Sequence, residues 1–282
     1  MSETGRLYVV STPIGNLEDM TFRAVRVLKE SALIAAEDTR VTAKLTGRYD
    51  IGTRVVSIRG ESAQRNCERV LRCLLDGQDA ALVTDAGTPS VSDPGLDLVA
   101  RAAEAGIVVS PVPGASALAA AVSVAGLPGE GVRFLGFLPR DGRRRREIIA
   151  SVRTESALTV LYESPRRVGE TLKELAEVCG SERRGAVLRE LTKVYEEIVR
   201  DDLPALAERF RTDVRGEITL AVSGVRSSET DEDLSLEDLR RLIEAELAAG
   251  RSVKDIAASL SKGLGLPRKE IYSLAVEIAA SR

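Results

Sequence analysis

Residues Leu82 to Gly95 read LVTDAGTPSVSDPG, and this stretch decides the fold because an apolar run passes here into a turn of small residues. The run before it, which begins at Asp79, is typical of a strand buried in a parallel sheet. The turn holds glycines, two prolines, small hydroxyl residues and two aspartates. Such residues let backbone N–H and C=O groups approach a ligand closely. Taken alone, however, the stretch is more typical of an ordinary connection between a strand and a helix.

Apolar runs alternate with amphipathic segments around this stretch. The alternation predicts an α/β fold with a mostly parallel sheet. We expect strands in residues 6–12, 32–38, 54–60, 79–84 and 107–112, with helices in 19–31, 67–75, 95–106 and 117–125.

The pattern restarts after the glycine-rich segment GLPGEG at residues 126–131. We therefore expect an N-terminal α/β domain over residues 1–126 and a second α/β domain over 127–224. A short acidic segment, 225–234, is typical of a linker. Residues 235–282 contain three helical patterns with glycine turns, which predict a helix-turn-helix-like tail. Such a tail could bind nucleic acid or dock on the rest of the chain.

The chain of 282 residues contains no histidine. This excludes Ser-His-Asp and Cys-His catalysis and the H-E-x-x-H metal site. It also removes the commonest general base near neutral pH. The chemistry must therefore use carboxylates, lysine, tyrosine or a cofactor that carries the reactive group.

The cysteines Cys67, Cys73 and Cys179 are odd in number and form no C-x-x-C pair. We interpret them as reduced thiols of a cytoplasmic protein, with neither a zinc site nor a disulfide framework. The first residues do not resemble a signal peptide, and no apolar stretch approaches the ~18 residues of a membrane span.

Five arginines occur within seven positions, at Arg140 and at residues 143–146, although the formal net charge is −3. They could form a solvated face or a loop that binds phosphate groups. Arg166 and Arg167 leave the same alternatives open, because they follow a predicted strand at the start of a predicted helix.

Four turns follow predicted strands of the first domain, at residues 11–19, 36–40, 84–95 and 111–117. Ligands of open parallel sheets bind beyond the carboxyl ends of the strands, so we expect these turns to face one rim. None of them matches G-x-G-x-x-G or G-x-x-x-x-G-K-[ST], and the usual dinucleotide and nucleoside-triphosphate sites therefore lose their support.

Several motifs together resemble one family. They are LYVVSTPIGNLED, IAAEDTR, ALVTDAGTPSVSDPG, PVPGASAL, FLGFLPR, YESPRR and RELTK. In this order they are similar to the bacterial small-subunit ribosomal RNA cytidine 2′-O-methyltransferases, of the tetrapyrrole methylase-like superfamily. The resemblance covers residues 6–224. It implies a two-domain tetrapyrrole methylase-like fold, S-adenosylmethionine in the cleft between the domains, no metal, a homodimer, and 16S ribosomal RNA of the small ribosomal subunit as substrate.

The resemblance also implies roles for particular residues. The cofactor cradle would consist of Pro13, Gly15, Gly87, Thr88, Val91, Ser116, Ala117, Tyr162 and Leu191. The turns AEDTR and ESPRR would face RNA, with RNA-binding arginines at Arg143, Arg144, Arg145, Arg166 and Arg167.

Related proteins carry histidines where this chain has Val41, Ser57–Ser62 and Arg166. Because the cofactor supplies the electrophile, we infer that the reaction does not require those histidines.

Methyl transfer from a sulfonium is an in-line displacement, and alignment supplies much of the rate. A base or a positive group would help, since a ribose hydroxyl is a weak acid. The candidates are Glu37, Asp38, Glu163, Glu190 and Lys193, with Arg40 and Arg166 as phosphate-binding or orienting groups. We predict direct involvement of Asp38, Arg40 and Lys193.

Two aspartates of the opening stretch, Asp85 and Asp93, could each contact the ligand or cap the turn. Two other functions stay open. The same fold could methylate a tetrapyrrole or a modified protein side chain, or the chain could be a non-catalytic RNA-binding relative.

Overall fold

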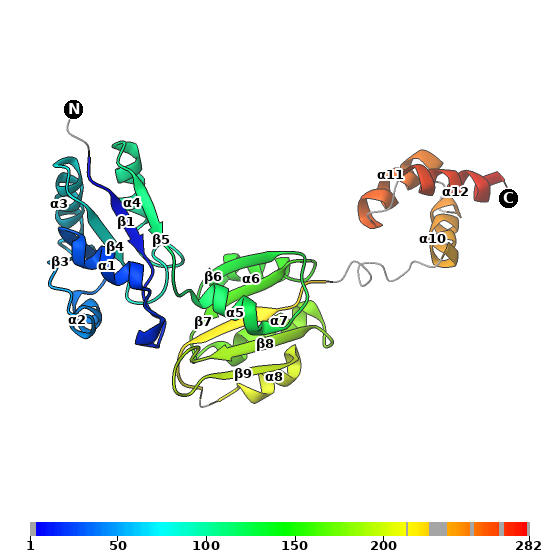
Figure 1. Ribbon diagram of the computed structural model, residues 1–282. Helices are drawn as coiled ribbons and strands as arrows, with labels where there is room; N and C mark the ends of the chain where they lie inside the picture. The colour runs from blue at the N-terminus through cyan, green and yellow to red at the C-terminus, as the bar shows by residue number, and fades with distance from the viewer. Residues whose placement is uncertain (1–3, 213, 226–235, 249–250, 265–267, 281–282) are drawn as a thin grey trace. The chain divides into compact units, whose positions relative to one another are not determined.

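The computed structural model describes residues 4–212, 214–225, 236–248, 251–264 and 268–280. The chain divides into two compact units, Met1–Val225 and Arg226–Arg282. Among the described residues, the first unit contains two β-sheets and the second contains three helices (Figure 1). Within these described ranges, none of the helices is long and apolar enough to span a lipid bilayer.

The first sheet is parallel throughout, as the sequence pattern predicts. Its strands run in the order β3-β2-β4-β1-β5. They are β1 (Leu7–Val10), β2 (Leu33–Ala36), β3 (Val55–Ser57), β4 (Ala80–Val83) and β5 (Val109–Val112). Strand β4, whose last two residues begin the stretch Leu82–Gly95, lies in the middle, and its side chains are buried on both faces.

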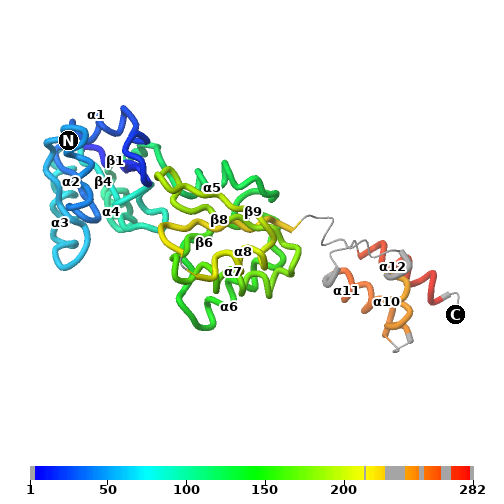
Figure 2. Tube along the Cα trace, turned by 90° about the horizontal axis from the view of Figure 1, so that it is seen from below, coloured from blue at the N-terminus to red at the C-terminus, as the bar shows by residue number. Residues whose placement is uncertain are grey.

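Helices cover both faces of this sheet (Figure 2). Helices α1 (Phe22–Glu30) and α2 (Thr39–Arg48) pack on one face, where they meet strand residues such as Ile34. Helices α3 (Ala63–Leu75) and α4 (Leu96–Glu104) pack on the other, against residues such as Leu33. Successive strand residues point to opposite faces, which explains the nearly continuous apolar runs.

The second sheet is mixed, with strand order β6-β7-β10-β8-β9. Its strands are β6 (Val132–Phe137), β7 (Leu158–Glu163), β8 (Arg184–Arg189), β9 (Glu197–Asp202) and β10 (Ile218–Val222). Only the pair β6–β7 is parallel, so the expectation of a mostly parallel sheet is wrong for this domain. Strand β9 was not expected, because its sequence EIVRDD is mostly charged; such residues are common on edge strands.

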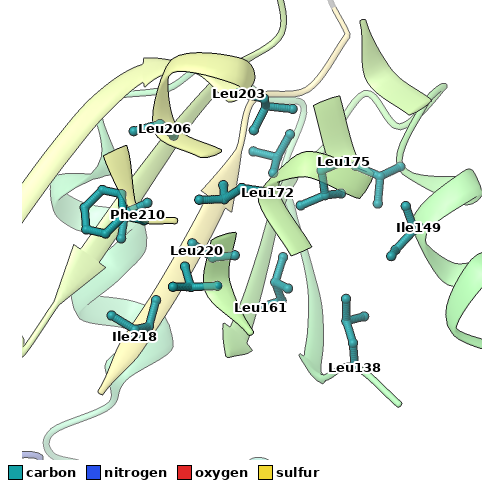
Figure 3. Close-up of a cluster of buried hydrophobic side chains, with 14 residues drawn as sticks. Leu138, Ile149, Leu161, Leu172, Leu175, Leu203, Leu206, Phe210, Ile218 and Leu220 are labelled. Carbon is teal, nitrogen blue, oxygen red and sulfur yellow. The ribbon is translucent and has the colours of Figure 1, made fainter. Parts of the chain in front are cut away.

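Four helices pack on the second sheet. Helices α6 (Gly142–Ser151), α7 (Val168–Cys179) and α8 (Leu203–Arg209) cover one face, and Figure 3 shows their apolar side chains against those of β7 and β10. Helix α5 (Ala117–Ala125) covers the other face. Packing therefore assigns α5 to the second sheet, although the sequence pattern had placed it in the first domain, which was expected to end at residue 126. Its alanines allow close contact with β10.

The arginine segment forms a helix, so of the two alternatives that the sequence left open, the structure does not contain the loop. Helix α6 begins at Gly142 and turns Arg145 and Ile149 toward the protein interior, one helical turn apart. This spacing places both residues on one face, whereas the neighbouring arginines point outward.

The second unit has a small hydrophobic core of its own. Helices α10 (Leu236–Ala248), α11 (Val253–Leu264) and α12 (Arg268–Ala280) pack through Ile243, Ile256 and Ile271. The expected helical tail is thus present in the described residues. The expected linker at 225–234 lies outside them, except for Val225.

Candidate active site

A cavity of about 350 Å³ lies where the carboxyl end of β4 approaches β6, β7 and β10. Its volume falls within the range of small-molecule sites. We call one side the first wall; it consists of Ile14, Ala86, Gly87, Thr88, Val91 and Asp93. The second wall consists of Phe137, Tyr162–Pro165 and 216–219, and Ser116 and Ala117 at the start of α5 complete the lining.

The first wall is held together by hydrogen bonds between two turns distant in the chain. The backbone N–H groups of Thr12 and Gly87 each donate to the other residue's carbonyl oxygen, both at 2.9 Å. The Thr12 hydroxyl donates to the carbonyl of Thr84 at 3.1 Å. The hydroxyls of Ser11 and Thr88 lie 2.9 Å apart. The turns after β1 and β4 therefore form one surface.

The loop after β4, which carries most of the first wall, is strained at two residues between the lining positions. Ser90 and Ser92 have φ values of +69° and +64°, in the left-handed region that non-glycine residues rarely adopt. Ser92 lies against Gly136 of β6, where an added Cβ would stand 2.6 Å from the serine Oγ. Strand β6 is irregular between Phe134 and Phe137, and Gly136 itself has a φ of +62°. The close approach of Ser92 and the positive φ therefore both favour glycine at position 136.

Aromatic rings form part of the second wall. The Tyr162 ring contacts the edges of Phe134 and Phe137, with centroids 4.9 and 5.5 Å apart. Burial raises the pKa of Tyr162, although a backbone hydrogen bond from Leu118 acts in the opposite direction. The phenol therefore stays neutral and presents a flat, mostly apolar surface.

A buried ionic network supports the turn that follows β7. Glu163, with a fully buried side chain, accepts hydrogen bonds from the Ser164 N–H at 2.7 Å and the Thr171 hydroxyl at 2.8 Å. Its carboxylate also lies 2.6 Å from the Arg167 guanidinium. Arg145 donates to Thr171 at 2.9 Å and contacts Glu174 at 2.6 Å. Each charge has a partner, which a buried ionic group requires.

Three carboxylates gather beside the first wall. Asp85 accepts a hydrogen bond from the Asp38 N–H at 3.0 Å, and Glu37 forms an ion pair with Arg59 at 3.0 Å. Partial burial, followed by the charges of Glu37 and Asp85, raises the pKa of Asp93 to about 6. The two aspartates that the sequence left open thus differ: Asp85 binds the protein backbone, whereas Asp93 lines the cavity.

The pair Asp38 and Arg40 lies outside the cavity lining. Asp38 caps α2 by accepting from the Arg40 N–H at 2.8 Å, and the Arg40 guanidinium contacts the same carboxylate at 2.7 Å. The hydrogen bonds from Arg40 lower the pKa of Asp38 to about 2. The Arg40 side chain is 89% exposed.

Lys193 is also absent from the lining and is held by two carboxylates. Its Nζ lies 2.7 Å from Glu190 and 3.0 Å from Glu217, which does line the cavity. Partial burial lowers the pKa of Lys193, but the hydrogen bonds to both glutamates outweigh it, and the pKa ends above its ordinary value. At neutral pH this lysine is therefore a cation and not a base.

Of the predicted cofactor residues, six line the cavity: Gly87, Thr88, Val91, Ser116, Ala117 and Tyr162. The other three, Pro13, Gly15 and Leu191, do not. Pro13 and Gly15 flank the lining residue Ile14, and Leu191 packs with Ile14 in one apolar cluster. An added Cβ at Gly15 would stand 2.4 Å from the Lys193 side chain.

The arginines predicted to bind RNA are in different environments. Arg143 and Arg144 on α6 and Arg166 after β7 are exposed. Arg167 is half-buried and paired with Glu163. Arg145 is 4% exposed and bonded on all sides, so we remove it from the RNA-binding set as a correction.

Sequence reasoning missed several lining residues, among them Phe137 and residues 216–219, which lead into β10. The sequence GEIT gives no ligand signal, since glycine before a strand is common. Asp93 was noticed but not assigned. The described parts of the chain contain no cluster of three acidic, cysteine or histidine residues able to hold a metal ion.

The chain belongs to the tetrapyrrole (corrin/porphyrin) methylase family, whose model matches residues 6–207. Within that family its similarity is to proteins named ribosomal RNA small subunit methyltransferase I. The protein of that name from Halalkalibacterium halodurans is 40% identical over 275 residues, 96% of this chain and 95% of the relative. The one from Escherichia coli O157:H7 is 39% identical over 276 residues, 97% and 95% of the two chains.

Solved structures with the same fold are more distant in sequence. A cobalamin biosynthetic enzyme, cobalt precorrin-4 methyltransferase, superposes with a TM-score of 0.62 at 20% identity over 77% of this chain and 94% of that one. Uroporphyrin-III C-methyltransferase from Thermus thermophilus, complexed with S-adenyl homocysteine, gives 0.55 at 23% identity over 78% and 97%. These structures establish the fold, which the motifs had predicted.

Proposed function

We propose that this protein transfers a methyl group from S-adenosylmethionine to the ribose 2′-oxygen of a cytidine in small-subunit ribosomal RNA. The observation that carries the proposal is the cavity itself. It is built from the turns that the family resemblance singles out, and exposed arginines follow two strands that reach it. Relatives of nearly full length carry the name of ribosomal RNA small subunit methyltransferases, which supports an RNA substrate.

The cavity lining fits S-adenosylmethionine. Ala86, Gly87, Ser116 and Ala117 have small side chains, so main-chain groups are accessible to the methionine and ribose parts of the cofactor. The aromatic rings of the second wall suit a purine. When bound, the cofactor supplies an electrophilic methyl carbon on a sulfonium. The protein's residues would bind it, exclude water and hold the acceptor hydroxyl in line.

The exposed arginines suit a polyanionic substrate. Arg166 follows Pro165 of the second wall directly, and Arg143 and Arg144 lie on the helix after β6. Guanidinium groups bind phosphates in a bidentate manner, which suits an RNA substrate. We further propose that the protein acts as a homodimer in the cytoplasm, and the direct involvement of Asp38, Arg40 and Lys193 stays a prediction.

A transfer assay tests this function. Purified protein, radiolabelled S-adenosylmethionine and small ribosomal subunits should yield labelled 16S RNA whose modified nucleoside, after digestion, is 2′-O-methylcytidine. Free 16S RNA and large subunits serve as comparison substrates. Label on a base, or no label on any RNA, would contradict the proposal.

Calorimetry with S-adenosylmethionine separates an enzyme from a non-catalytic RNA-binding relative. We expect one cofactor site per chain. A chain that binds RNA but no cofactor would contradict the enzymatic function.

A further inference from the structure

Three arginines stand next to segments that line the second wall. Arg140 comes three residues after the end of β6, Arg166 directly follows the lining turn after β7, and Arg215 directly precedes the lining residues 216–219. We call Arg140, Arg166 and Arg215 the arginine row. Of the three, the family resemblance had singled out Arg166 for RNA binding, so the other two need an argument from the structure.

The topology of the second sheet brings the arginine row together. Strand β7 lies between β6 and β10. It is parallel to β6, with Tyr162 opposite Phe137. It is antiparallel to β10, with Glu163 opposite Ile218. The carboxyl ends of β6 and β7 and the amino end of β10 therefore share one end of the sheet. Neighbouring strands are about 4.8 Å apart, so the three strand ends span roughly 10 Å.

The side chains of the arginine row are available to a ligand. All three are exposed. Among the residues that the structure describes, none of the three guanidinium groups makes a hydrogen bond or an ion pair. Arg143, by contrast, contacts Glu147 at 2.6 Å. A guanidinium group without a protein partner offers its whole fork of donors to a phosphate.

Neighbouring acids do not cancel the charge of the arginine row. Glu217 and Asp141 are the described acids within two residues of it along the chain. Glu217 is paired with Lys193, whose Nζ lies 3.0 Å from its carboxylate. Asp141 is exposed and follows Arg140, where it offsets one of the three positive charges. The row therefore keeps a net positive charge.

The first wall has the opposite electrostatic character. The arginines beside it, Arg40 and Arg59, are each paired with an acid, at 2.7 and 3.0 Å. Asp85 and Asp93 add further carboxylates on that side. A polyanion is therefore attracted to the second wall and repelled by the first.

From this arrangement we propose that the arginine row holds consecutive phosphates of the single RNA strand that carries the target nucleotide. The inference rests on the proposed function and identifies the part of the substrate that the protein grips. A stacked strand carries one phosphate per about 3.4 Å, so roughly 10 Å accommodates about three phosphates. A second strand, as in a duplex, would bring its phosphates toward the carboxylates of the first wall. The row binds and positions the strand and takes no part in bond making.

The test measures binding of labelled RNA to the full-length chain by fluorescence anisotropy at a series of potassium chloride concentrations. The probes are a short mixed-sequence RNA strand and the duplex that it forms with its complement. The native protein should bind the single strand more tightly. Arg140→Ala, Arg166→Ala and Arg215→Ala should each lower the slope of log binding constant against log salt concentration by about 0.7–1. The triple substitution should lower it by about 2–3.

Arg184→Ala is the matched control. Arg184 begins β8 at the opposite end of the same sheet, and its side chain is 54% exposed, so the substitution removes the same charge from the same domain. It should leave the salt slope unchanged. Lysine at the three positions of the row should restore most of the slope, because the slope reports charge. Equal shifts for the control and for the row variants would reveal a general effect of net charge and overturn the proposal.

Single-turnover methylation of small ribosomal subunits separates binding from chemistry. The triple variant should need about tenfold more subunits for its half-maximal rate. Its rate at saturating subunits should stay within about twofold of the native rate, since the row makes no contact with the reacting atoms. An unchanged affinity for S-adenosylmethionine, measured by calorimetry, shows in addition that the variant is folded.

Three results would overturn the arginine row while leaving the proposed function intact. The first is a triple variant with the native salt slope. The second is tighter binding of the duplex than of the single strand. The third is native binding of the RNA strand together with weakened binding of subunits, which would assign the row to an acidic surface of a ribosomal protein. Failure of the native protein to bind S-adenosylmethionine or to methylate any ribosomal RNA would instead contradict the proposed function.

Discussion

The two walls of the cavity are built on opposite electrostatic principles. The second wall buries Glu163 completely and surrounds it with Arg167, Thr171 and, at 3.9 Å, Arg145. The first wall leaves Asp93 partly buried, and the charges that act on it, those of Glu37 and Asp85, have the same sign as its own. A network of ion pairs makes a rigid support for the turn after β7. The molecule thus places its paired charges and the Asp93 carboxylate on separate walls.

The largest loss of stability should come from removing one charge of the buried ionic network that supports the second wall. Arg145→Ala removes the cation that contacts Thr171 and Glu174 and leaves buried polar atoms without partners. We expect a loss of about 3 kcal/mol in the free energy of unfolding, measured by urea denaturation. Arg144→Ala, on the exposed side of the same helix, should change it by less than about 0.5 kcal/mol. Equal effects of the two variants would mean that the network does not support the fold.

The junction of the walls should be the next most sensitive place. Gly136→Ala introduces a Cβ 2.6 Å from the Ser92 Oγ at a φ of +62°, so we expect a cost of about 2 kcal/mol and weaker cofactor binding. Gly142→Ala is the matched control, because its φ is +87° but no atom lies within 4 Å of the added Cβ. It should cost about 1 kcal/mol and leave cofactor affinity unchanged. Identical cofactor affinities for the two variants would show that Ser92 does not position the first wall.

The folded protein should become more stable at neutral pH when the Asp93 charge is removed. Because the pKa of Asp93 is raised in the folded state, the protein loses stability as pH rises from the ordinary value near 3.8 to about 6. At pH 7.5, Asp93→Asn should therefore have a free energy of unfolding up to about 1 kcal/mol higher than that of the native protein, after solvent screening is allowed for. Thermal unfolding should show this as a higher unfolding temperature. The advantage should vanish below pH ~4, where the native carboxyl is neutral as well. A variant less stable than the native protein at pH 7.5 would contradict the raised pKa.

The smallest effect on folding should come from replacing Arg166, which lies outside both walls. Arg166→Ala should leave the free energy of unfolding within about 0.5 kcal/mol. It should weaken binding to small subunits. It should also reduce the slope of the logarithm of the binding constant against the logarithm of salt concentration by about one. Arg26→Ala, on the exposed surface of α1, is the control for a general charge effect. An unchanged salt slope would remove Arg166 from the RNA-binding surface.

How much the sequence could predict depends on whether a residue's role is local. Gly87, Thr88 and Ser116 were predicted as cofactor-binding residues because the resemblance to a known family implies it, and the structure places them in the cavity lining. The burial of Arg145 could not be predicted, because five neighbouring arginines look alike until the helix selects one face. The raised pKa of Asp93 depends on its burial and on the charge of Glu37, 56 positions away. Such properties arise only from the tertiary arrangement.

The order of the second sheet has a consequence for how the protein is made. Strand β10 is the last of the five strands of this sheet along the chain, yet it lies in the middle of the sheet, between β7 and β8. During synthesis, β7, β8 and the apolar face of α5 must therefore wait for residues 218–222 before they can pack. At the usual elongation rate of about 5–20 residues per second, the wait from the end of α5 lasts roughly 5–20 s. The first sheet, complete at β5, can form during that time, so the cavity has one finished side before the other exists.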